Sequence, residues 1–154
     1  MRRFNWKLFI ISLVIPLAVG GVSTWLIRDN LDIYSEINLP AFAPPSIIFG
    51  IVWTVLYIIM GVSLYLVLNS GKSDKESIYY FSLQLLFNFC WPIAFFNFRL
   101  FWFAFVWLLV LLYLIVRMII KFWKINRVSG ILQIPYAVWV TFAGVLNLAI
   151  AILN

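Results

Sequence analysis

Charged residues are so sparse that they divide the chain into five long uncharged stretches. These stretches cover residues 8–27, 37–71, 77–98, 100–116 and 128–154. A hydrocarbon core about 30 Å thick needs roughly 20 helical residues, so each stretch supplies one transmembrane helix. The pattern predicts an all-α fold, a five-transmembrane-helix bundle forming a single integral membrane domain over residues 1–154. We expect its helices at about residues 7–27, 46–68, 78–96, 100–121 and 130–153.

Composition agrees with this interpretation. The chain is 66% hydrophobic and 10% charged, with a mean hydropathy of +1.08, whereas soluble domains carry about 25% charged residues. A cleavable signal peptide is the alternative for the N-terminus, because Arg2 and Arg3 precede an apolar run. That run is longer than a signal h-region and has no A-x-A-like site, so we expect the first helix to be retained.

The lysines and arginines predict an orientation. With five spans, one face of the membrane receives nine of the eleven: Arg2, Arg3, Lys7, Lys72, Lys75, Arg117, Lys121, Lys124 and Arg127. The other face receives Arg28 and Arg99. The positive-inside rule then places the N-terminus in the cytoplasm and the C-terminus outside. This distribution accounts for the net charge of +6, and no nucleic-acid partner is expected.

The chain has few side chains that could bind a metal ion or form a covalent bond. It has one cysteine, Cys90, and no histidine, so an intrachain disulfide, a Cys/His metal site and a haem with an axial histidine are not expected. No tightly bound cofactor is expected either.

Aromatic and amide side chains inside the uncharged stretches are the candidate functional groups. They are Trp53, Tyr57, Gln84, Asn88, Trp91, Tyr136, Trp139 and Asn147. Lipid provides no partner for an indole N–H or a carboxamide, so such groups either lock helices together or line a cavity. For any single tryptophan, packing is the commoner role.

Depth in the membrane favours a cavity. At about 1.5 Å per helical residue, Trp53, Asn88, Trp91 and Trp107 lie roughly 9–14 Å below the outer surface, with Trp139 nearer the midplane. The outer loop 28–45 ends in a proline-rich tail, which is expected to be extended and stiff and to act as a lid. Aromatic walls with a few polar groups suit a planar apolar molecule.

Five groups of residues resemble the TspO/MBR family, which includes the tryptophan-rich sensory proteins and the mitochondrial translocator protein, or peripheral benzodiazepine receptor. They are Leu39-Pro40-x-x-x-Pro44-Pro45, Trp53-Thr-x-Leu-Tyr57-x-x-Met60-Gly61, Gln84-x-x-x-Asn88-x-x-Trp91-Pro92-x-x-Phe95-Phe96, Trp102, and Pro135-Tyr136-x-x-Trp139-x-x-Phe142-Ala143-x-x-Leu146-Asn147. They occur in the family's order along nearly the whole chain, and a bacterial member is the nearest likeness.

The resemblance implies a homodimer in a bacterial cell membrane that binds protoporphyrin IX and benzodiazepine or isoquinoline carboxamide ligands. It also implies light- and oxygen-dependent degradation of the porphyrin. The candidate ligand-binding residues are Pro44, Trp53, Tyr57, Asn88, Trp91, Trp102, Trp139, Ala143 and Leu146.

The chain departs from the family at three places. Phe42 replaces the usual loop tryptophan, an acidic residue of the fourth helix is replaced near Val106, and residues 145–154 lack the animal-type cholesterol motif. Sterol binding is therefore not expected.

The leading hypothesis is a porphyrin-binding protein that promotes photo-oxidation of its ligand. Trp53 and Trp139 are the candidate electron donors, Asn88 orients a polar edge of the ligand, and Arg28 pairs with a propionate. A carrier or sensor that leaves tetrapyrroles or other lipophilic ligands unchanged is the alternative. A purely structural membrane subunit is a third hypothesis.

Overall fold

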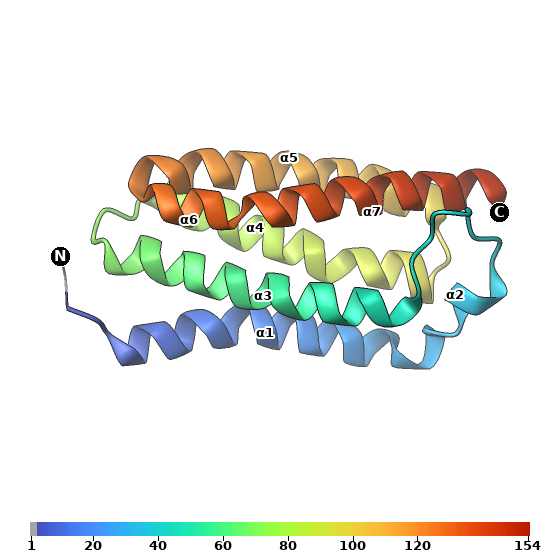
Figure 1. The fold of residues 1–154 in the computed structure, drawn as a ribbon, viewed down its shortest axis with the longest axis horizontal. Helices are drawn as coiled ribbons and strands as arrows, with labels where there is room; N and C mark the ends of the chain where they lie inside the picture. Colours follow the sequence, from blue (N-terminus) through green and yellow to red (C-terminus); the bar gives the residue numbers. More distant parts are fainter. Residues whose placement is uncertain (1–2) are drawn as a thin grey trace.

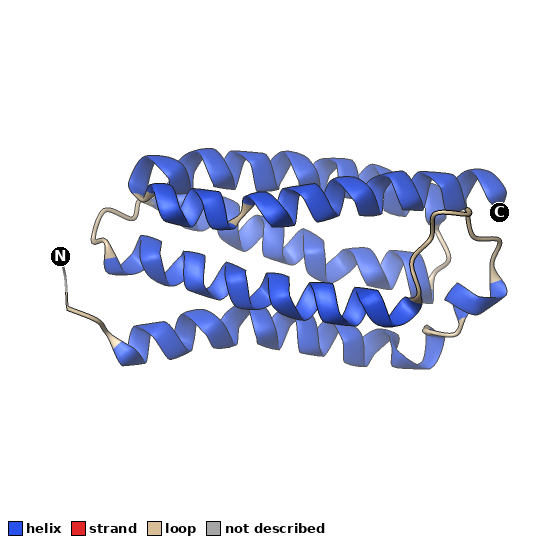
Figure 2. Ribbon diagram, in the orientation of Figure 1, coloured by secondary structure: helices blue, strands red, loops and turns tan. Residues whose placement is uncertain are grey.

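The computed structural model describes residues 3–154, which form an all-helical bundle without strands (Figures 1 and 2). Five helical spans are long and apolar enough to cross a membrane. They run side by side along the long axis of the molecule (Figure 1). The predicted five-helix membrane fold is confirmed, while the direction in which it sits in the membrane stays a prediction.

The spans are α1 (Trp6–Ile27), α3 (Ser46–Asn69), α4 (Lys75–Pro92), α5 (Phe101–Ile125) and the pair α6 (Arg127–Leu132) and α7 (Ile134–Leu153). A π-helical turn, Ile93–Asn97, extends α4. The outer loop contains a 3₁₀ turn (Arg28–Asn30) and the short helix α2 (Ile33–Glu36). Its proline-rich tail, predicted to be extended, is free of helix but includes a turn in which the Ala43 N–H donates to the Pro40 carbonyl at 3.0 Å.

The predicted loop between the last two spans is a single residue, because α5 continues to Ile125 and α6 begins at Arg127. Asn126 has extended backbone angles, and its side chain accepts hydrogen bonds from the N–H groups of Val128 and Ser129. That cap starts the next helix at once. Gly130 makes the tight turn possible, because a Cβ there would lie 2.9 Å from Trp123.

Helix packing leaves the bundle closed at one end and open at the other. α3 packs on α1 and α6, but it has few close backbone contacts with α4 or α7. Gly61 lets α1 and α3 touch, since a Cβ there would meet the Leu13 backbone at 2.7 Å. Towards the end that carries the 28–45 loop, α3 therefore stands away from α4 and α7.

Candidate functional site

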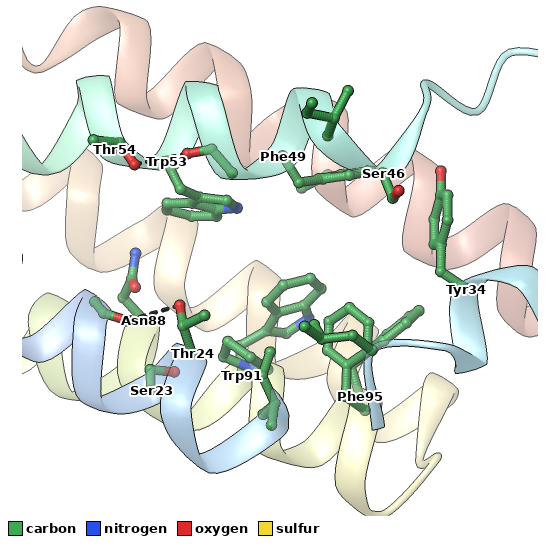
Figure 3. A pocket seen from close by; sticks show the side chains of 18 of the residues that line it. Ser23, Thr24, Tyr34, Ser46, Phe49, Trp53, Thr54, Asn88, Trp91 and Phe95 are labelled. Atoms are coloured by element: carbon green, nitrogen blue, oxygen red, sulfur yellow. Dashed lines mark hydrogen bonds between the residues drawn. The ribbon is translucent and has the colours of Figure 1, made fainter. Parts of the chain in front are cut away.

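A cavity of about 750 Å³ occupies the space left between α3 and the opposing helices (Figure 3). Its walls come from the second half of α1, the first half of α3, the end of α4 with its π-helical turn, and the second half of α7. Leu31, Asp32 and Tyr34 of the outer loop border its end. A cavity of this size is in the range that accommodates small-molecule ligands.

Two indoles from different helices face this space (Figure 3). The Trp91 indole nitrogen donates to Asn147 Oδ1 at 3.1 Å, and the Asn147 amide donates to the Phe101 carbonyl at 2.8 Å. These bonds fix the ring of Trp91. Trp53 stacks on Tyr57 with ring centroids 5.8 Å apart, and its own N–H has no hydrogen-bond partner within residues 3–154. The Trp53 N–H therefore remains available to a ligand.

A buried hydrogen-bond network forms the floor of the cavity. The Tyr57 hydroxyl donates to Asn88 Oδ1 at 2.6 Å, and Asn88 Nδ2 donates to the Tyr136 hydroxyl at 2.8 Å. Tyr136 donates in turn to Gln84 Oε1 at 2.7 Å. The network links α3, α4 and α7 across the gap between them. Gly20 makes room for it, because a Cβ at that position would lie 2.3 Å from the Tyr57 ring.

Hydrogen bonds hold the outer loop in place along its length. Asn30 Nδ2 donates to Asn97 Oδ1 at 2.9 Å, and Arg99 pairs with Glu36 at 3.1 Å. The Asn38 backbone N–H donates to Asn154 Oδ1 at 3.0 Å, and Asn154 Nδ2 donates back to the Asn38 carbonyl at 3.0 Å. The loop is therefore tied to the α4–α5 turn and to the end of α7.

Tyr34 connects two parts of the outer loop at the edge of the cavity. Its hydroxyl donates to the Pro44 carbonyl at 2.8 Å. Burial raises the pKa of this hydroxyl, so it stays protonated and able to donate throughout the neutral pH range. Pro44 is thus part of the loop's internal bonding and is not among the residues that line the cavity.

The lining of the cavity holds one charged side chain, the exposed carboxylate of Asp32 at its loop end. Arg28, expected to meet a propionate, instead lies over the Trp25 ring at 4.7 Å and next to Asp29 at 3.5 Å. It does not line the cavity. The enclosed part of the site is therefore neutral, and any ionised group of a ligand would remain at the loop end.

Six of the nine sequence-predicted residues line the cavity: Trp53, Tyr57, Asn88, Trp91, Ala143 and Leu146. Trp139 does not line it, and its ring packs on Phe49 with centroids 5.8 Å apart and on Phe142 with centroids 5.3 Å apart. Trp102 lies outside it as well. That side chain is 58% exposed and belongs to α5, a helix that supplies none of the lining.

Trp107, placed by depth in the same layer, is also on α5. It stacks on Phe87 at 4.2 Å and donates to the Phe87 carbonyl at 2.8 Å, so it locks α5 to α4.

The sequence interpretation missed the contribution of α1 and of several phenylalanines. Leu17, Gly20, Gly21 and Thr24 follow one another at helical spacing on the cavity side of α1. Phe49, Phe95 and Phe96 complete the aromatic walls. The spacing in α1 was the available signal, but small residues there are equally typical of helix packing.

Comparison with known proteins relates nearly the whole chain to one family. The family model described as TspO/MBR matches residues 12–153. The tryptophan-rich protein TspO of Chlorobaculum tepidum is 33% identical over 90% of both chains, and that of Archaeoglobus fulgidus is 31% identical over 93% of this chain and 94% of its own. The translocator protein of Ovis aries is 30% identical over 87% of this chain and 82% of its own. This integral membrane protein therefore belongs to the TspO/MBR family.

Proposed function

We propose that the cavity binds a planar lipophilic molecule, with a porphyrin such as protoporphyrin IX as the leading candidate, and that it promotes light- and oxygen-dependent degradation of that molecule. The observation that carries the proposal is the pair of indoles, Trp53 and Trp91, facing one cavity of about 750 Å³ whose only charged lining residue among residues 3–154, Asp32, lies at the loop end. Benzodiazepine and isoquinoline carboxamide ligands, which are aromatic and uncharged, suit the same walls.

In this proposal the porphyrin absorbs the light and undergoes the chemistry, and the protein binds the porphyrin and orients it. Asn88 and the free N–H of Trp53 would orient polar edges of the ring, while Trp91 and Phe95 would hold its faces. Trp53 is the proposed electron donor to the excited porphyrin. Trp139 is a weaker candidate for that role than the sequence indicated, because it does not line the cavity and contacts one of its lining residues, Phe49, instead.

Illumination of the purified protein with protoporphyrin IX in oxygen tests the photochemical part. We expect the Soret band to decay in the wild-type protein, and Trp53→Phe to slow that decay at least fivefold at equal occupancy. Trp139→Phe is the matched control and should slow it less than twofold.

Two results would contradict this assignment. Equal decay rates in wild type and Trp53→Phe would remove Trp53 from the photochemistry. Recovery of unchanged porphyrin after illumination would favour the carrier or sensor function instead, which uses the same cavity without transforming its ligand.

A further inference from the structure

The last membrane span is interrupted inside the bundle. A single residue, Gln133, separates α6 from α7 within the span Arg127–Leu153 (Figure 2). Pro135 accounts for the interruption, because it has no N–H to donate to the carbonyl of Ile131 four residues earlier. Backbone groups that lose their helical partners within a membrane need partners from side chains or ordered water. We call this point, at Gln133, the helix break.

A serine from another helix pairs with the backbone at the helix break. The Gln133 N–H donates to the Gly130 carbonyl at 3.2 Å, in a 3₁₀-type bond, and not to the Ser129 carbonyl that a continuous α-helix would use. The Ser129 carbonyl accepts instead from the hydroxyl of Ser63 on α3, at 2.9 Å. Ser63 and Ser129 are both fully buried, so the helix break turns polar groups toward the interior of the bundle.

Polar side chains at the helix break are buried without a partner from the protein. Gln133 and Ser129 are 0% exposed, and among residues 3–154 neither polar atom of the Gln133 carboxamide has a hydrogen-bond partner, nor does the Ser129 hydroxyl. Gln84 of α4 is also 0% exposed, and its amide nitrogen is unpaired as well. Burying polar atoms without hydrogen bonds is costly, so these atoms require a partner from outside the chain.

The unpaired groups adjoin the hydrogen-bond network at the floor of the cavity. Ser129, Gln133 and Tyr136 follow one another at helical spacing and are all fully buried, so they share one face of the last span. Side chains of a helix lean toward its N-terminus, which directs the Tyr136 ring back toward the turn of Gln133. The Tyr136 hydroxyl donates to Gln84 Oε1 at 2.7 Å. The Gln84 carboxamide is thus held next to the helix break from α4.

The chemistry of the unpaired atoms favours water as their partner. The two carboxamide nitrogens and the serine hydroxyl can donate, whereas Gln133 Oε1 and the serine oxygen can accept. None of these groups is charged, so they cannot balance the charge of a buried ion. Water both donates and accepts, and a buried water typically makes about three hydrogen bonds.

We infer that water is bound at the helix break, where Gln133, Ser129 and Gln84 hold it. The bound water completes the hydrogen bonds of Gln84, which in turn accepts from Tyr136. The polar network therefore continues from Asn88 at the floor of the cavity to the helix break. This inference goes beyond the proposed function and does not depend on which ligand the cavity binds.

Gln133→Leu tests the inference, because a hydrated and a dry helix break predict opposite effects on stability. In a dry site leucine removes an unpaired buried amide and raises the melting temperature. In a hydrated site it removes bonds to the water that Gln84 and Ser129 share. We therefore expect the melting temperature of the purified protein to fall by about 2–4 °C. Val138→Leu is the matched control, since Val138 is 63% exposed on α7, and it should leave the melting temperature unchanged.

X-ray radiolysis detects the water itself, because hydroxyl radicals formed from a bound water oxidise the side chains beside it. Tyr136 is the reporter. Phe122 of α5 is the comparison, since it is equally buried and stacks on Phe81. We expect Tyr136 to be oxidised at least fivefold faster than Phe122 in the wild-type protein, as measured by mass spectrometry. Gln133→Leu should slow the oxidation of Tyr136 at least threefold.

A melting temperature that rises or stays unchanged in Gln133→Leu would overturn the inference. Equal oxidation of Tyr136 and Phe122 in the wild-type protein would do so as well, and that comparison needs no variant to fold. Oxidation of Tyr136 that Gln133→Leu does not slow would also overturn it, because water in the ligand cavity alone gives that result.

Discussion

Replacing Asn88 by leucine is expected to lower the free energy of unfolding by about 1–3 kcal/mol. The change removes the bonds from Tyr57 and to Tyr136 and leaves the Tyr57 hydroxyl without an acceptor. Hydrogen bonds between membrane helices average about 0.6 kcal/mol each, so the larger part of the loss comes from the unpaired hydroxyl. Reversible unfolding of the purified protein in detergent measures the change.

The double variant Tyr57→Phe/Asn88→Leu separates these two contributions. It removes the hydroxyl that the single variant leaves unpaired, so we expect it to be at least as stable as Asn88→Leu alone. If the losses of Tyr57→Phe and Asn88→Leu simply add, the two side chains do not act as a pair and the floor of the cavity is held in another way.

Replacing Ala143 by phenylalanine is expected to weaken binding of protoporphyrin IX at least tenfold, which corresponds to about 1.4 kcal/mol. Ala143 is 4% exposed on α7 and lines the cavity, so the new ring occupies ligand space. Trp91 cannot easily yield to it, because its indole is held by Asn147. Titration followed by the shift of the Soret band gives the Kd.

Val145→Phe is the control for this prediction, because Val145 is two residues away on the same helix and 55% exposed. It adds the same ring on the outer surface of the bundle and should leave the Kd unchanged. Equal affinities of the two phenylalanine variants would show that the ligand binds elsewhere.

The fold was predictable because the membrane imposes one simple rule on it. Uncharged stretches of about 20 residues have few alternatives to a spanning helix, and all five were found. The turn at Asn126 was not predictable in the same way. Lys124 and Arg127 fell in the loop expected between residues 121 and 130, yet in the structure they lie on helices that continue to the turn. Long cationic side chains can reach water from a helix end, so their presence does not mark where the helix stops.

The site was predictable in part. The sequence indicates how deep in the membrane a side chain lies, but not whether that side chain points into the bundle or away from it. Trp53 and Trp107 were placed at the same depth, yet one faces the cavity and the other stacks on Phe87. Trp102 was assigned through the family resemblance alone, and its side chain is 58% exposed. Trp139 was a candidate on its own pattern as well, and its ring packs on Phe49 and Phe142.

The contribution of α1 was the hardest part to foresee. Glycine and leucine carry no polar group that would be costly in lipid, so Gly21 and Leu17 gave no chemical signal. Only the cavity that α1 shares with α3, α4 and α7 gives them a role, and that cavity depends on the packing of the whole bundle.

Protection of a single thiol in the cavity tests most directly whether the ligand binds there. Cys90, the sole cysteine, does not line the cavity and is replaced by alanine. A new cysteine is then introduced as Ala143→Cys, or as Val145→Cys for the control. Modification by methyl methanethiosulfonate is followed by mass spectrometry with and without saturating protoporphyrin IX. We predict that the porphyrin slows modification of Ala143→Cys at least tenfold and leaves Val145→Cys unaffected. Equal rates with and without porphyrin at Ala143→Cys, under conditions where the porphyrin is bound, would contradict the account.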